Sequence, residues 1–395
     1  MIKDINGTVK KMTGNKYKLL VTYYNDFEER QRKQKVIEVD STRKAYVELD
    51  SWIEELTRNG FGSLDKITLE TFYKKMWMKD AESLLESRSY LDYMKIMDTR
   101  IIPTFGSMKI KSIRTFHIQN YINQAKNLKN GNELAYTTKK KILNVLSSVF
   151  NLAIDVYRIM DESPVEKVKI KRKKKEVKKV CKPYNLSEIN LFLKAVNKPK
   201  TPLDTKAFLL TAFVTGARES ELAGLLESDI DFNQKKIWIH QRITKRPKFE
   251  EDDLKEEYYC APGTKTGDEL TMVVPDDYLK VMKEFILMKK KQRLTLGINP
   301  DRAYLFGNVD GSFVLPTSLY RKWTRFAKRN NLRVIRLHDI RHTTASFLAA
   351  DPTVPLKVIQ ERLGHKDIRT TMNMYASALE ESDIIASNAI SSVFR

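Results

Sequence analysis

The 395-residue chain has very little cysteine and no long apolar run. Its two cysteines, Cys181 and Cys260, form neither a metal-ligand cluster nor a disulfide framework. No apolar stretch approaches the ~18 residues needed to span a bilayer, and the longest, at residues 207–214, suits a buried helix. The N-terminal residues lack the apolar core of a signal sequence. These absences favour a protein of the reducing cytoplasm and argue against a membrane partner.

Acidic residues are too few to balance the basic ones. The chain has 71 Lys and Arg against 50 Asp and Glu, a formal charge of +21. Such an excess favours a polyanionic partner, of which nucleic acid is the commonest and an anionic membrane surface is the alternative. Because the chain has no membrane-directed segment, we favour nucleic acid.

Changes of pattern along the chain predict a multidomain, mainly α-helical protein without internal repeats. Residues 1–62 have the β-rich segments and the capped helix of a small α+β unit. The next segment repeats apolar residues at intervals of three and four, which predicts a bundle of four or five helices. The last part mixes helices with two strands, expected at 235–243 and 270–275. The predicted divisions are 1–62, 66–163, a linker at 164–184, and 185–395 with a C-terminal tail helix.

The predicted linker contains an unusually dense run of basic residues. Residues 167–182 hold ten basic side chains and one acidic one, a net charge of +9. A solvated charge run is one interpretation. The other is a segment that follows a phosphate backbone, where each neutralised phosphate releases about 0.9 counterion. We favour the second, with Lys171, Arg172, Lys173, Lys174 and Lys175 as the DNA contacts.

The segment HDIRH raises the question of a metal site. His338 and His342 are four residues apart on one helix face, and Asp339 stands where the zinc motif H-E-x-x-H has its glutamate. Against a zinc metallohydrolase, Asp is shorter than Glu, and Arg341 would place a cation beside a dication. The hypothesis also leaves the positive charge of the chain unexplained. We therefore expect no metal.

Three further stretches carry residues that are ordinary when taken alone. TGARESEL places Arg218 at a helix start with Glu221 one turn on, which alone is a typical surface ion pair. TKTGDE places Lys265 in a turn before the second strand, although Lys255 in the same long connection is a rival. LGHKDIRTTMNMY places His365 after a glycine and Tyr375 ten residues later.

Together, TGARESEL, HDIRHT and LGHKDIRTTMNMY resemble the tyrosine recombinase, or phage integrase, family from about residue 66 to the end. The resemblance implies that two arginines clamp a DNA phosphate, that a histidine adds a donor, and that a tyrosine attacks phosphorus to form a 3′-phosphotyrosyl link. It implies no cofactor. The residues that match are Arg218, Arg341 and His365 on the phosphate, Tyr375 as nucleophile, Lys265 as acid for the leaving oxygen, His338 assisting the tyrosine, Glu221 supporting Arg218, and His342 as a packing residue.

The same resemblance assigns roles to the predicted parts. Residues 66–163 are similar to the helical core-site-binding domain, although Ser163-Pro164 stands where the family usually has Asn-Pro. Residues 1–62 resemble the arm-type-site DNA-binding domain, and 185–395 the catalytic domain. The two larger domains would close around the duplex. The apolar stripe after Tyr375 fits equally a helix that packs on its own domain and a tail that docks on a neighbouring protomer.

These observations predict a site-specific recombinase, an integrase of a phage or integrative mobile element. Four protomers would exchange strands of double-stranded DNA through a Holliday junction. A type IB topoisomerase-like nicking-closing enzyme, a chromosome-resolving recombinase and a non-catalytic DNA-binding regulator are the alternatives. The family commonly uses an excisionase and a host DNA-bending protein, and nothing in the chain names either.

Overall fold

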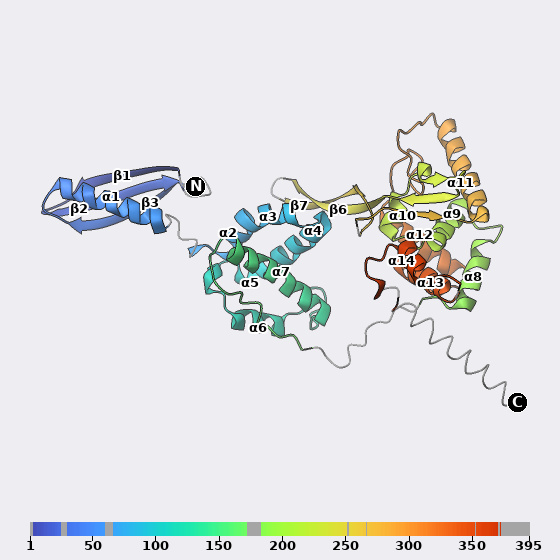
Figure 1. Cartoon of the computed structure of the whole chain (residues 1–395), viewed down its shortest axis with the longest axis horizontal. Helices are drawn as coiled ribbons and strands as arrows, with labels where there is room; N and C mark the ends of the chain where they lie inside the picture. The colour runs from blue at the N-terminus through green and yellow to red at the C-terminus, as the bar shows by residue number, and fades with distance from the viewer. Residues whose placement is uncertain are drawn as a thin grey trace, which may run out of the picture. The chain divides into compact units, whose positions relative to one another are not determined.

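The computed structural model describes residues 3–24, 30–59, 66–171, 183–250, 253–265, 267–351, 353–369 and 372. The chain divides into two compact units, Met1–Glu176 and Val177–Arg395 (Figure 1). Within the described ranges, no helix has the length and apolar character to cross a membrane. The fold class predicted from the sequence is confirmed: the chain is multidomain and mainly helical, with a small N-terminal α+β part.

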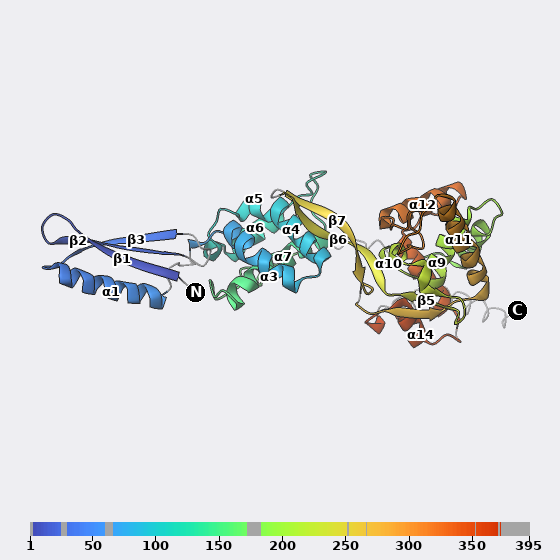
Figure 2. The same ribbon diagram turned by 90° about the horizontal axis from the view of Figure 1, so that it is seen from above.

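An antiparallel sheet with strand order β1-β2-β3 begins the first unit. Gly14, with φ +69°, takes the left-handed conformation that the turn between β1 and β2 requires. Tyr17, Leu19, Val21 and Tyr23 alternate along β2 and are buried, because α1 covers that face of the sheet (Figure 2). The opposite face carries basic side chains such as Lys10, Lys18 and Arg32, together with the exposed Tyr24 and Val36. The elements are β1 (Lys3–Lys11), β2 (Lys16–Tyr24), β3 (Arg30–Glu38) and α1 (Thr42–Asn59).

The rest of the first unit is a helical bundle. Its core contains Phe72, Trp77 and Phe150, all almost fully buried. Two π-helical turns, Tyr73–Trp77 and Met97–Ile101, join α2 to α3 and α4 to α5, so each pair forms one continuous helical run. The helices are α2 (Leu69–Phe72), α3 (Met78–Leu84), α4 (Ser87–Ile96), α5 (Ile102–Phe105), α6 (Thr115–Gln124) and α7 (Tyr136–Asp155).

The second unit packs helices around a core that includes Phe208, Ile237 and Trp323. The expected buried helix at 207–214 lies within α9, where Ala207, Phe208 and Leu209 have no exposed surface. The helices are α8 (Leu186–Val196), α9 (Leu203–Thr215), α10 (Glu219–Gly224), α11 (Asp276–Thr295), α12 (Pro316–Arg329), α13 (Leu337–Ala349) and α14 (Leu356–Leu363).

The strands of this unit correct one prediction from the sequence. The strand expected at 235–243 is two strands in different sheets, which separate at His240. β5 pairs with β8 as expected, but β6 and β7 form a hairpin of their own, which extends away from the body of the unit (Figures 1 and 2). The side chain of Gln241 fixes the break, because it donates to the Gly224 carbonyl. The strands are β4 (Ile230–Asp231), β5 (Lys236–Ile239), β6 (Gln241–Glu250), β7 (Asp253–Pro262) and β8 (Leu270–Val273).

Candidate active site

Arg218 stands at the N-terminal boundary of α10 and is held by Glu221. The guanidinium Nη1 donates to Glu221 Oε1 at 2.8 Å, and the Arg218 backbone N–H donates to Glu221 Oε2 at 2.9 Å. Glu221 has no exposed surface, and the Arg218 side chain is 16% exposed. The pair is therefore a shielded ion pair rather than the surface pair that the motif alone suggests, because both groups are largely withdrawn from water.

The chain reaches Arg218 through a tight turn at the end of α9. Gly216 has φ +61°, and a Cβ at this position would lie 2.7 Å from a Leu363 methyl carbon. The Ala217 N–H donates to the Thr215 hydroxyl at 3.1 Å. Only glycine combines this backbone conformation with such close packing. The turn thus brings α10 and its arginine against the end of α14.

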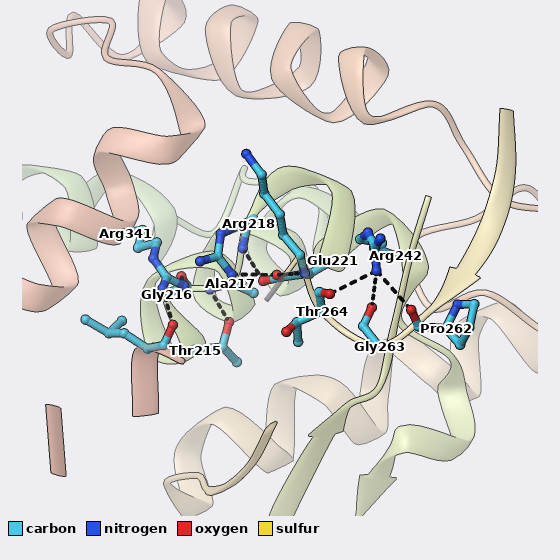
Figure 3. A network of polar contacts seen from close by, with 12 residues as sticks. Thr215, Gly216, Ala217, Arg218, Glu221, Arg242, Pro262, Gly263, Thr264 and Arg341 are labelled. Atoms are coloured by element: carbon cyan, nitrogen blue, oxygen red, sulfur yellow. Dashed lines mark hydrogen bonds and ion pairs between the residues drawn. The ribbon is translucent and has the colours of Figure 1, made fainter. Parts of the chain in front are cut away.

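Arg341 on α13 joins the two segments that carry the other motifs. Its side chain is fully buried, and it donates through Nη1 to the Gly216 carbonyl at 3.0 Å and through Nη2 to the Leu363 carbonyl. Its Nε is buried and has no partner within the described residues. Burial, and then the charge of Arg218, lower the pKa of Arg341 to about 10, and Glu221 opposes that shift. Arg218, Glu221 and Arg341 lie beside one another in Figure 3.

His338 and His365 lie close enough to both arginines to be affected by their charges, and His342 lies near Arg341. Burial, then Arg341 and Arg218, lower the pKa of His365 to about 4. Partial burial, then His342, Arg341 and Arg218, also lower the pKa of His338, although its side chain keeps contact with solvent. His342 lies against His338 with ring centroids 4.9 Å apart, and burial lowers its pKa too. The histidines are therefore neutral near pH 7, and the site is prepared to receive negative charge.

Lys265 lies in the turn between β7 and β8. Its backbone N–H is 3.5 Å from Glu221 Oε1, so the carboxylate that holds Arg218 also lies beside this turn. The rival Lys255 pairs with Lys248 near the tip of the hairpin. It lies seven positions before Pro262 at the base of β7, roughly 23 Å at the usual rise of a strand. The backbone of Lys265, and not that of Lys255, therefore lies beside the carboxylate that holds Arg218.

The predicted site residues include some that lie outside the described part of the chain. Tyr375 and the tail that follows it lie outside the described residues, as do Arg172, Lys173, Lys174 and Lys175. Lys171 is described and exposed. As for the zinc hypothesis, no group of three or more His, Cys, Asp or Glu is arranged to hold a metal ion in the described part of the chain.

One supporting residue was not anticipated from the sequence. Arg362 on α14 donates to the Val214 carbonyl at 3.0 Å and to the Val273 carbonyl at 3.1 Å. It ties α14 to the end of α9 and to β8, and so fixes the segment that leads to His365. Its bonds reach backbone carbonyls 89 and 148 residues away, so no local sequence pattern reveals them.

Comparisons with known proteins agree with this arrangement. The family pattern "Phage integrase family" matches residues 184–382, and "Phage integrase, N-terminal SAM-like domain" matches residues 68–125. The integrase of Staphylococcus phage L54a is 24% identical over 353 residues, covering 85% of this chain and 89% of that protein. The ICEBs1 integrase of Bacillus subtilis is 27% identical over 250 residues, covering 61% and 62%.

Two solved structures share the fold. The Tn1549 transposon integrase in complex with transposon right end DNA is 19% identical, with a TM-score of 0.58, and the alignment covers 81% of this chain and all of that one. A lambda integrase tetramer bound to a Holliday junction is 16% identical, with a TM-score of 0.52, and the alignment covers 91% and 95%.

Proposed function

The chain belongs to the phage integrase family of tyrosine recombinases, and on that premise we propose that it inserts a phage or integrative element into DNA through a 3′-phosphotyrosyl intermediate. It is a DNA strand-transferring enzyme of the integrase type. The observation that carries the proposal is a cluster in which Arg218 and Arg341 lie near the buried carboxylate of Glu221, while the charges of both arginines act on His338 and His365. Such a site suits a phosphodiester whose oxygens gain charge in the transition state.

In the proposed reaction, the phenolic oxygen of Tyr375 forms a bond to phosphorus while the bond from phosphorus to the 5′ oxygen breaks. The proton of the tyrosine passes to His338, whose lowered pKa leaves it neutral and able to accept one. Lys265 protonates the departing 5′ oxygen. Rejoining reverses these steps with a new 5′ hydroxyl, so the energy of the broken bond is kept in the protein–DNA ester and no cofactor is needed.

Arg218, Arg341 and His365 would bind the non-bridging oxygens. Arg218 presents a planar guanidinium whose Nη1 is already oriented by Glu221. Arg341 uses one N–H of Nη1 and one of Nη2 on main-chain carbonyls, so the N–H of Nε and the second N–H of each Nη remain for a phosphate oxygen. A phosphate would also raise the pKa of His365 by bringing negative charge beside it. His342 would support this helix face by packing against His338.

The N-terminal sheet supports a second DNA contact in the proposed arm-type-site domain, 1–62. The face turned away from α1 carries Lys18 beside Lys10, and Arg32 beside Thr22. Residues 66–163 would bind the core site and the linker at 164–184 would follow the backbone. The part from 185 to 395 would hold the active site and a tail helix that packs in cis or in trans.

We propose that four protomers act together on double-stranded DNA through a Holliday junction. The lambda integrase tetramer, which is bound to such a junction, supports this assembly through its shared fold. An excisionase and a host DNA-bending protein are proposed as partners only because members of the family commonly use them.

A DNA cleavage assay tests the proposal. A nicked attachment site, which releases the short 5′-hydroxyl strand after cleavage, should accumulate a denaturant-stable protein–DNA adduct. The Tyr375→Phe variant should form none. Two paired sites should recombine, while plasmids without a site should stay supercoiled. Relaxation of such plasmids without any recombination would favour the topoisomerase-like alternative, and the absence of any adduct would favour a DNA-binding regulator.

A further inference from the structure

We propose that Arg242 is a positioning residue that sets the orientation of the Lys265 turn for protonation of the leaving group. The Nη1 atom of Arg242 donates to three successive main-chain carbonyls, those of Pro262 at 2.9 Å, Gly263 at 3.0 Å and Thr264 at 2.9 Å (Figure 3). Lys265 is the next residue along the chain. The inference rests on the proposed function, in which Lys265 is the general acid.

A positive group stabilises the turn at the position where these three carbonyls converge. Three carbonyl dipoles that converge on one position repel each other unless a positive group lies between them. The left-handed conformation of Gly263, with φ +68°, produces the convergence. A guanidinium stays charged at any physiological pH and is rigid. Since Nη1 carries two hydrogens and contacts three oxygens, at least one hydrogen is shared, and the group binds the whole curve of the turn rather than one peptide.

The backbone of Arg242 is itself in contact with α10, the helix that begins after Arg218 and carries Glu221. A Cβ on Gly224, at the end of α10, would lie 2.8 Å from the Gln241 carbonyl oxygen and 2.9 Å from the Cα of Arg242, so the helix and the strand are in direct backbone contact. Arg218 and Glu221 stand at the other end of this short helix. The chain of contacts therefore runs from Arg218 through α10 to Arg242, and from its guanidinium to the Lys265 turn.

The other basic residues at the start of this hairpin have a different environment. Lys245 pairs with Glu256, and Arg246 pairs with Glu257 and lies over the Tyr259 ring. Those contacts join β6 to β7 across the hairpin and do not involve the turn. Arg246 is therefore a matched control for Arg242, because it is an arginine on the same strand, four residues away, whose guanidinium pairs with Glu257 and lies over the Tyr259 ring.

Main-chain bonds should preserve the turn when Arg242 is removed. The Gly263 N–H donates to the His240 carbonyl at 2.6 Å, and the Thr264 N–H donates to the Asp268 carbonyl at 3.1 Å. The Gly267 N–H donates to the Thr264 carbonyl at 2.9 Å. We therefore expect an Arg242→Ala protein that folds and binds DNA but holds Lys265 in a wider range of orientations.

A sulfur-substituted DNA separates positioning of the acid from general damage. In a nicked site whose scissile 5′ oxygen is replaced by sulfur, the leaving group is a thiolate. A thiol has a pKa near 8.5, so its thiolate departs without help from an acid. General acid catalysis contributes about 10²–10⁴-fold. We expect Arg242→Ala to cleave the oxygen substrate about 10- to 100-fold more slowly than wild type, and the sulfur substrate at nearly the wild-type rate.

Three further variants make the outcomes distinguishable. Lys265→Ala should show the same pattern with a larger loss on oxygen. Arg242→Lys, which keeps the charge without the planar guanidinium, should lie between wild type and Arg242→Ala, and it decides the question if Arg242→Ala does not fold. Arg246→Ala should match wild type on both substrates.

Equal slowing of Arg242→Ala or Arg242→Lys on both substrates, with Lys265→Ala still rescued by sulfur, would overturn the role of Arg242 and leave the proposed function intact. If sulfur does not rescue Lys265→Ala, the assignment of the acid fails together with the role of Arg242. Absence of an adduct with the wild-type protein would refute the proposed function itself.

Discussion

Replacing Glu221 with Gln should weaken both the fold and the reaction. The carboxylate is buried and accepts from the Arg218 side chain at 2.8 Å and from the Arg218 backbone at 2.9 Å. Glutamine keeps the shape but turns one oxygen into an N–H donor and removes the negative charge that pairs with Arg218 and also acts on Arg341. A lost charge-assisted hydrogen bond costs about 1.5–3 kcal/mol, and an arginine left largely buried without its partner raises the cost to about 3–5 kcal/mol.

Thermal unfolding measures this cost. For a unit of this size, each kcal/mol lowers the unfolding temperature by about 2–4 °C, so a cost of about 3–5 kcal/mol for Glu221→Gln should lower it by roughly 6–20 °C. Glu219→Gln, on the exposed surface of the same helix, should change stability by less than about 0.5 kcal/mol. In a double-mutant cycle with Arg218→Ala, the double variant should lose about 1–3 kcal/mol less unfolding free energy than the sum of the two single variants. Full additivity together with an unchanged unfolding temperature would refute the pairing.

Three other outcomes follow from the structure. The folded protein holds the pKa of His365 near 4, below its ordinary 6.5. The contribution of neutral His365 to the free energy of unfolding is therefore present above pH 6.5 and is lost as the pH falls toward 4. Calorimetry should show that the stability of His365→Gln falls less steeply than that of wild type between pH 6.5 and pH 4. Replacing the five basic residues at 171–175 with serine should lower the slope of log affinity against log salt by up to about 4.5, whereas an unchanged slope would indicate a solvated run. Lys18→Ala should weaken arm-type-site binding in a mobility-shift assay and leave core-site binding unchanged.

The parts of the site that sequence predicts are those in which spacing along the chain determines geometry. Arg218 and Glu221 are three residues apart at a helix start, and His338 and Arg341 are three apart on one helix, so helical periodicity brings each pair together. The contact of Arg341 with the Gly216 carbonyl spans 125 residues, and no local pattern contains it. From the sequence, only the resemblance to a family indicates that the segments of Gly216 and Arg341 belong to one site.

The features that sequence missed arise from tertiary contacts. The alternation of KKIWIHQRI continues through His240, so the period of a strand gives no sign of the break between β5 and β6. The break depends on Gln241, whose amide reaches the Gly224 carbonyl and whose oxygen accepts from Arg302. The π-helical turns at Tyr73–Trp77 and Met97–Ile101 change the helical period over only five residues each, which is too short to alter the apolar pattern of the sequence. Arg242 donates to the main-chain carbonyls of residues 262–264, and such contacts produce no sequence motif.

The most direct test of the account is to identify the residue that carries the DNA. The adduct formed on a nicked attachment site should be digested with protease and nuclease, and the nucleotide-linked peptide sequenced by mass spectrometry. The proposed mechanism predicts a single modified peptide, with the 3′ phosphate on the oxygen of Tyr375 and none in the Tyr375→Phe protein. A phosphate on serine, on another tyrosine, or on no residue would contradict it.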